Sequence, residues 1–153
     1  MDEPVTDVLF TLEKLDVQTC VDKVTHQACG AISVFIGTTR DLMNGRHVVQ
    51  LDYECYQEMA EKEVKKICNQ TRERWKEIKN IAIHHRLGTV PVKEVSIVIA
   101  ISSPHRVDAL AATQFCIDTL KATVPIWKKE VYNDGTTEWM ENKECTWKIS
   151  KQT

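Results

Sequence analysis

The sequence predicts an α+β fold, a mixed or antiparallel sheet with helices packed on it, because strand and helix signals are mixed along the chain. Two pairs of strand-like segments follow each other without an intervening helix, which argues against a doubly wound parallel sheet. The 153 residues contain no linker, repeat or low-complexity segment. We therefore expect a single domain over residues 1–153, long enough to bury about two-thirds of its unfolded surface.

The first part of the chain predicts a strand, a short helix and a buried strand. Residues 8–12 form a short apolar strand, and apolar residues at helical spacing predict a helix over 17–24. Residues 29–37 are a nearly continuous apolar run bounded by glycines, which indicates a buried strand. The polar segment 38–46 carries an Asn-Gly pair, typical of a tight turn between strands.

The middle of the chain predicts a returning strand, a helix and a strand pair. Residues 48–56 alternate well enough to form the strand that returns from the turn. Apolar residues with charges between them predict an amphipathic helix over 58–75. Residues 78–87 and 95–101 predict two further strands around the turn-like segment 88–91.

The last third predicts a helix followed by a strand. Ser103-Pro104 suits the start of a helix, because Ser is a favoured N-cap and Pro a favoured first helical residue. We expect this helix to run to about Lys121 and a strand to span residues 126–132.

Composition excludes several classes of function. The net charge of −2 gives no reason to expect nucleic acid or a membrane surface as a partner. No apolar run approaches the roughly 18–20 residues of a membrane span, and the first residues do not resemble a signal peptide, so we expect a cytosolic location. The six cysteines lack metal-ligand or disulfide spacing and are expected to be free thiols.

The segment 120–130 is the strongest candidate for chemistry. Lys121 and Lys128 stand there among apolar residues, on either side of Pro125. An apolar wall or a second cation lowers the pKa of a lysine, which can then act as acid, base or nucleophile. The alternative is that both lysines snorkel to the surface. On the expected strand Lys128 and Glu130 share a face, so Glu130 could hold Lys128 in place or share a proton with it.

Two further basic groups suggest a site for an anion. Arg40 follows Gly37, where a ligand could approach the backbone closely. His105 and Arg106 stand in the first turn of the expected helix, where the helix dipole disfavours cations, so a bound phosphate or carboxylate would explain them. The alternatives are a solvated loop arginine, an exposed Arg106 and a helix-capping His105.

No metal or nucleotide cofactor is expected. His84 and His85 are adjacent, so on a strand they would face opposite sides and could not easily share one ion. The chain lacks a Gly-x-Gly-x-x-Gly motif, a P-loop and a Gly-x-Ser-x-Gly motif. Together the basic clusters indicate an anionic small molecule handled without a metal.

Five motifs occur in order between about Gly30 and Trp139. They are Gly30-Ala31-Ile32 with Phe35-x-Gly37-x-x-Arg40, Leu51-x-Tyr53-Glu54-x-Tyr56 with Met59-Ala60, His85-Arg86-x-Gly88, Ser103-x-His105-Arg106, and Leu120-Lys121-x-x-x-Pro125-x-Trp127-Lys128-Lys129-Glu130. In this order and spacing the chain resembles the large, catalytic subunit family of molybdopterin synthase, and residues 124–130 resemble its animal members.

The resemblance implies a sulfurtransferase of molybdenum cofactor biosynthesis. It would convert cyclic pyranopterin monophosphate (precursor Z) into molybdopterin by installing the dithiolene sulfurs. A small ubiquitin-like subunit would carry the sulfur as a thiocarboxylate on its C-terminal Gly-Gly, and that tail would thread into a pocket of this chain. The family assembles as a heterotetramer around a homodimer of large subunits.

The resemblance also implies roles for individual residues. Lys121 and Lys128 match the catalytic positions of the family, and Ile117 replaces a methionine of bacterial members. Lys143 stands where those members place an arginine after the final tryptophan. The substrate-binding positions are Arg40, His105, Arg106, Phe35, Ile117, Glu130 and Lys143.

The length of the helix adds a geometric hypothesis. His105 and Lys121 are sixteen positions apart, or about 24 Å along a helix, so one pterin-sized pocket cannot contact both ends. We therefore expect a composite site, with Lys121, Lys128 and Arg40 from one chain and His105 and Arg106 from its dimer mate.

Two other functions use parts of the same pattern. A non-catalytic pterin- or phosphate-binding module that docks a ubiquitin-like partner needs the basic pocket but no reactive lysine. A persulfide enzyme would use Cys116 or Cys55, yet neither cysteine has a basic neighbour in sequence.

Overall fold

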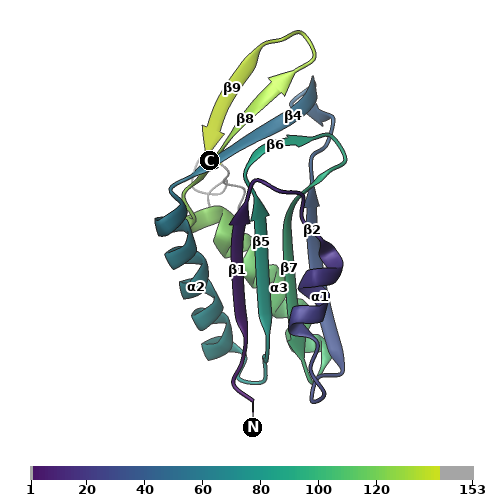
Figure 1. Cartoon of the computed structure of the whole chain (residues 1–153), viewed down its shortest axis with the longest axis vertical. Coiled ribbons are helices and arrows are strands. Elements are labelled where there is room, and N and C mark those ends of the chain that lie inside the picture. The colour runs from purple at the N-terminus through teal and green to yellow at the C-terminus, as the bar shows by residue number, and fades with distance from the viewer. Residues whose placement is uncertain (1, 142–153) are drawn as a thin grey trace, which may run out of the picture.

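A computed structural model describes residues 2–141, which form two sheets and three helices (Figure 1). The first sheet is mixed, with β1 and β5 parallel and the other neighbours antiparallel. In spatial order it contains β1 (Thr6–Thr11), β5 (Ile81–Arg86), β7 (Val95–Ser103) and β2 (Ala31–Thr38). This arrangement confirms the predicted α+β class.

The second sheet is antiparallel and lies beyond one end of the first (Figure 1). Its strands are β3 (Leu42–Met43), β4 (Arg46–Cys55), β8 (Ile126–Tyr132) and β9 (Thr137–Glu141), with β6 (Gly88–Pro91) also paired to β4. The Asn44-Gly45 turn joins β3 to β4, and both turn residues have positive φ, as a tight hairpin requires.

The helices cover opposite faces of the first sheet. In Figure 1, α1 (Val17–Val24) lies on the near face, whereas α3 (Arg106–Thr123) crosses the far face beside α2 (Gln57–Arg74). The alternation along β7 explains this division, because successive side chains of a strand point to opposite faces. Val98 and Ala100 pack toward α1, and Ile97, Ile99 and Ile101 belong to the larger core with α2 and α3.

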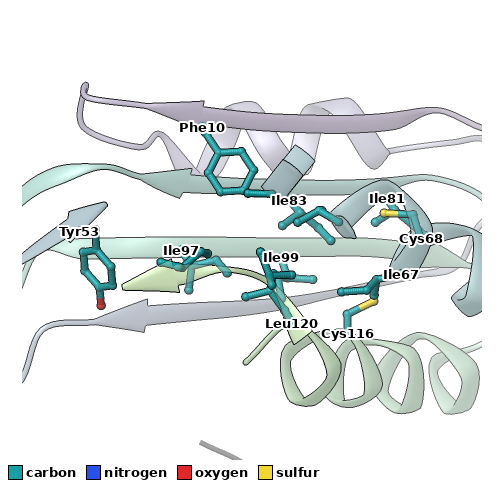
Figure 2. Close-up of a cluster of buried hydrophobic side chains, with 14 of the residues drawn as sticks. Phe10, Tyr53, Ile67, Cys68, Ile81, Ile83, Ile97, Ile99, Cys116 and Leu120 are labelled. Carbon is teal, nitrogen blue, oxygen red and sulfur yellow. The ribbon is translucent and has the colours of Figure 1, made fainter. Parts of the chain in front are cut away.

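The larger core is built from β-branched and other apolar side chains that meet between the sheet and the two long helices. Figure 2 shows Ile81, Ile83 and Ile99 beside Leu120 of α3 and Ile67 of α2. Burying each such side chain contributes about 1.5–3 kcal/mol. The core therefore fixes α3, whose last turns carry Lys121, against the sheet.

Most of the predicted elements are confirmed, and three details were wrong. Residues 88–91 form β6 rather than only a turn, because they pair with β4. Ser103 ends β7, and α3 begins at Arg106 with His105 as its N-cap and no side-chain capping bond. Strand β2 is an edge strand rather than a buried one, since Ile32 and Ile36 are 39% and 43% exposed.

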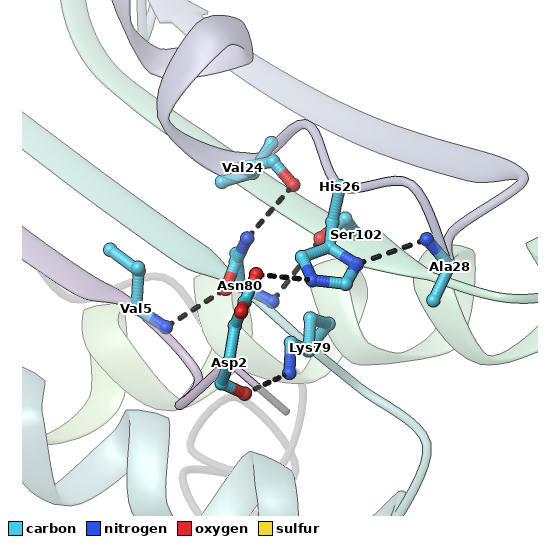
Figure 3. Close-up of polar contacts among 8 residues, drawn as sticks. All are labelled: Asp2, Val5, Val24, His26, Ala28, Lys79, Asn80 and Ser102. Carbon is cyan, nitrogen blue, oxygen red and sulfur yellow. Dashed lines mark hydrogen bonds and ion pairs between the residues drawn. The ribbon is translucent and has the colours of Figure 1, made fainter.

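A buried amide closes the opposite end of the first sheet (Figure 3). The Asn80 side chain accepts a hydrogen bond from the Val5 backbone N–H (2.8 Å) and donates to the Val24 carbonyl (3.3 Å). Its backbone N–H donates to the Ser102 hydroxyl (3.2 Å). Asn80 thus joins α1 and β7 to the residue that precedes β1. Among the described residues, no helix is long and apolar enough to cross a membrane.

Candidate active site

A cavity of about 420 Å³ lies where the first sheet, the second sheet and the end of α3 meet. Its volume falls in the range of roughly 300–1,000 Å³ that small-molecule sites occupy. Five elements carry most of its wall: β2, β4, β7, α3 and β8. Five of the predicted site residues line it, namely Phe35, Arg40, Ile117, Lys121 and Lys128.

The two lysines reach the cavity because the chain reverses between α3 and β8. Helix α3 ends at Thr123, the Val124 N–H bonds to the Leu120 carbonyl, and β8 begins at Ile126. Inward and outward residues alternate along β8, so Lys128 is only 8% exposed. Burying an ammonium group carries a large desolvation cost. A charged side chain that is buried at a cavity wall despite this cost is typical of a functional site.

Glu130 shares the inward face of β8 with Lys128, as predicted, and is 1% exposed. Its carboxylate accepts a hydrogen bond from the Tyr132 hydroxyl (3.1 Å). Glu130 is not among the residues that line the cavity. Glu130 thus lies next to Lys128 on the inner face of β8 and away from the cavity surface that a ligand would touch.

Arg40 is held at the rim by its neighbour Thr39. The Thr39 N–H donates to the Glu94 carbonyl (3.1 Å), and its own carbonyl accepts from the Lys93 N–H (2.8 Å). Glu94 in turn pairs with Arg86 at 2.8 Å, and this hydrogen bond lowers the pKa of the Glu94 carboxyl. The exposed Arg40 guanidinium therefore projects from a fixed backbone.

Gly37 lines the cavity two residues before Thr39 and has a packing role as well. A Cβ at this position would lie 2.7 Å from Cγ2 of Ile97. Arg46, the other arginine of this loop, stacks over the Tyr132 ring at 3.5 Å from its centroid and does not line the cavity.

His105 and Arg106 lie away from the cavity. Both are exposed at the start of α3, about 22–24 Å along the helix from Lys121. The structure therefore brings together only one of the two predicted parts of the anion site within a chain. Lys143 lies outside the described residues.

The cavity residues that sequence reasoning missed include two with polar side chains and aromatic rings, Tyr53 and His85. Tyr53 stands opposite Lys128 in the pairing of β4 with β8. His85 was assigned to the core or the surface, and it is buried but also lines the cavity. Both belong to the motifs that carry the family resemblance, which was the available signal. The adjacent His84 faces away and pairs with Asp7 (2.5 Å).

The described residues offer no alternative redox or metal centre. They contain no group of three or more His, Cys, Asp or Glu suited to a metal ion. Burial raises the pKa of the Cys116 thiol to about 11 and also raises that of Cys55. A thiol that stays protonated is a poor nucleophile, which argues against the persulfide alternative.

Comparisons with known proteins agree on one family. The sequence model of the family described as MoaE protein matches residues 10–123. Molybdopterin synthase catalytic subunit 1 of Aedes aegypti is 58% identical over 143 residues, which cover 92% of each chain. Molybdopterin synthase catalytic subunit of Homo sapiens is 53% identical over 148 residues, covering 96% of this chain and 78% of the human protein.

Solved structures agree with the fold. Molybdopterin synthase from Staphylococcus aureus superposes with a TM-score of 0.80 at 32% identity, over 92% of this chain and 98% of that chain. A protein–protein complex of subunits 1 and 2 of molybdopterin-converting factor from Helicobacter pylori gives a TM-score of 0.67 over 92% of both chains. At 18% identity, that second match shows the fold alone.

Proposed function

Because the chain belongs to the MoaE family, that of the molybdopterin synthase catalytic subunits, we propose that its cavity is where sulfur reaches the pterin substrate. Family membership makes the chain an enzyme of molybdenum cofactor biosynthesis. The observation that carries the proposal is the convergence of Lys121, Lys128 and Arg40 on one cavity of about 420 Å³. Three cationic side chains around a pocket of this size suit a small, phosphorylated substrate.

The substrate would be cyclic pyranopterin monophosphate, and its phosphate would bind near Arg40. An arginine can hold phosphate oxygens through paired N–H donors. Phe35 and Ile117 line the same cavity and would contact the apolar faces of the pterin. This arrangement leaves the inner end of the cavity, where Lys128 lies, for the chemistry.

A small ubiquitin-like subunit would deliver the sulfur as a thiocarboxylate on its C-terminal Gly-Gly tail. Lys121 would meet the end of this tail, where its ammonium group can hold the thiocarboxylate by charge. Alternatively, its neutral amine can attack the carbonyl carbon to form a transient amide, which water later hydrolyses, as the C–S bond breaks and the sulfur passes to the pterin. Lys128 would supply or remove the proton needed as the sulfur bonds to the pterin side chain, with Glu130 supporting Lys128 from behind. The cytosol, where thiols stay reduced, is the expected location.

His105 and Arg106 would complete the site from a second copy of the chain. They are exposed at the far end of α3, so a twofold pairing of large subunits could bring them to the partner's cavity. This arrangement would place a homodimer at the centre of a heterotetramer. Mixing Lys121→Ala chains with Arg106→Ala chains should restore some activity, because one site of the mixed dimer is intact. Mixed dimers that never exceed their parents would contradict the shared site.

The test of the proposed function measures molybdopterin formed from the cyclic substrate and a thiocarboxylated carrier subunit. Lys121→Ala and Lys128→Ala should each lower turnover at least ~10²-fold, the scale of losing one acid–base group. Lys129→Ala is the matched control, since Lys129 points outward from β8 and pairs with Asp52 at 3.5 Å. Unchanged turnover in both cavity variants would remove the two lysines from the mechanism.

A further inference from the structure

His85 has a fixed orientation at the inner wall of the cavity. Its Nδ1 lies 2.7 Å from the Arg86 carbonyl oxygen. The ring stacks on Phe10 at 6.0 Å between centroids and 18° between planes, and meets the Tyr53 ring edge-on at 4.9 Å and 74°. Two aromatic contacts and one hydrogen bond therefore determine where the second ring nitrogen points.

The hydrogen bond also determines the tautomer. A carbonyl oxygen only accepts, so Nδ1 carries the proton and donates it, and Nε2 of the neutral ring carries a lone pair. Burial lowers the pKa of the His85 imidazole to about 4; the bond to Arg86 opposes this shift and the charge of Lys121 adds to it. At neutral pH the cavity wall thus presents an acceptor rather than a further cation.

Lys121 is a suitable donor for this acceptor. Both residues line the cavity, and the charge of Lys121 acts on the His85 ring. A role in core packing alone would need neither the polar ring nor its place on the cavity wall, since an apolar side chain of similar size would fill the space next to Phe10. The lone pair of His85 Nε2 is instead suited to holding the Lys121 side chain in one direction.

We propose that His85 is a positioning residue for Lys121: its Nε2 accepts a hydrogen bond from the Lys121 side-chain nitrogen and sets the direction in which that nitrogen faces the cavity. The proposal rests on the proposed function only for its catalytic consequence. The contact itself is a property of the free chain.

Three substitutions of His85 separate the acceptor from the packing. His85→Gln keeps an amide oxygen near the position of Nε2, His85→Asn keeps a polar group only near Nδ1, and His85→Phe keeps the ring without either nitrogen. We expect kcat to fall about 10-fold or more in His85→Asn and His85→Phe, with KM for the pterin changed less than about 3-fold, because the affected lysine acts in the chemical step. His85→Gln should retain most of the activity. His84→Gln, on the opposite face of β5, should change kcat less than about 2-fold.

A second measurement does not depend on activity. The ¹⁵N NMR signal of His85 Nε2 should lie on the hydrogen-bonded side of the lone-pair range, and it should move toward the free lone-pair value in Lys121→Met. An unchanged Nε2 signal, or a protonated Nε2 in the free chain, would overturn the contact. Equal kcat in His85→Gln and His85→Asn would overturn the positioning role. If instead the signal moves but Lys121→Ala remains fully active, the contact stands and the proposed function fails.

Discussion

Two groups of polar side chains lie at opposite ends of the first sheet, around the buried Asn80 and around the cavity. Asn80 is neutral; its side-chain amide bonds to the Val5 N–H and the Val24 carbonyl, and its backbone N–H bonds to the Ser102 hydroxyl. The cavity end instead gathers the cations Lys121, Lys128 and Arg40 around open space. This difference separates two roles. A neutral buried side chain that is hydrogen-bonded to the backbone stabilises the packing of helices and strands, whereas charged side chains that face a cavity are suited to binding a ligand.

The largest test of this comparison is Lys128→Met, which removes charge from the cavity while keeping an unbranched side chain. Turnover should fall at least ~10²-fold. Stability should stay within about 1 kcal/mol of the wild type when Glu130→Gln is introduced together with Lys128→Met, because no buried carboxylate then remains beside the methionine. Turnover and urea unfolding, measured on the same preparation, check both parts. A large loss of stability would make Lys128 a structural residue like Asn80.

The opposite pattern is expected for Asn80→Leu. This change leaves the Val5 N–H and the Val24 carbonyl without their partner, so unfolding should need about 3 kcal/mol less. Turnover per folded molecule should not change, because Asn80 lies at the far end of the sheet from the cavity. Asn69→Leu, on the exposed surface of α2, is the control and should change stability by less than about 0.5 kcal/mol. Lost turnover in folded Asn80→Leu would break the comparison.

A pH dependence of stability is predicted from His85. Its folded-state pKa of about 4 lies below the unfolded value of 6.5, so the unfolded chain binds the proton first as the pH falls. The contribution of the neutral His85 ring to the free energy of unfolding is fully present above pH 6.5 and declines toward pH 4. About 2 kcal/mol of the free energy of unfolding is lost by pH 5. Urea unfolding of wild type and His85→Phe at pH 7 and pH 5 measures it. Between pH 7 and pH 5, the free energy of unfolding of His85→Phe should fall by less than that of the wild type. An equal fall in both proteins would contradict the claim that His85 is buried in its neutral form.

The smallest effect is expected for Gly37→Ala at the cavity wall. The new Cβ would lie 2.7 Å from Ile97 Cγ2, so the Ile97 side chain must move. Overpacking of this kind should cost about 1 kcal/mol and raise KM for the pterin more than it lowers kcat. The double variant Gly37→Ala/Ile97→Ala should be less destabilised than the sum of the single changes. If the two losses of stability simply added, the strain in Gly37→Ala would not come from the contact with Ile97.

The sequence predicted the cavity lysines better than their surroundings. The spacing of Lys121, Pro125 and Lys128 already indicated a helix end followed by a strand, and that local geometry delivers both side chains to one place. The role of His85 depends on which nitrogen meets the Arg86 carbonyl and on rings from β1 and β4, which no local pattern encodes. Strand β6 was missed for the same reason, because its partner β4 lies far away in sequence.

The placement of His105 and Arg106 shows a different limit. Helical rise alone separates them from Lys121, so the sequence could exclude a site within one chain. The length of a helix says nothing about which surface of a second chain lies beside it. The shared site therefore stays a prediction until mixed dimers are assayed.

The alternation along β8 has a consequence for the doublet Lys128-Lys129. A shift of the strand by one residue exchanges its two faces, so Lys129 would turn inward as Lys128 turned outward. The cavity would keep an ammonium group, whereas Glu130 would be replaced on the inner face by Val131. A one-residue deletion between α3 and β8 would thus keep an ammonium group at the cavity and remove Glu130 from the inner face, whereas a one-residue insertion would put Trp127 in the place of Lys128. The doublet would therefore keep a cation at the cavity if this junction became one residue shorter, a change that would otherwise remove the cation in a single step.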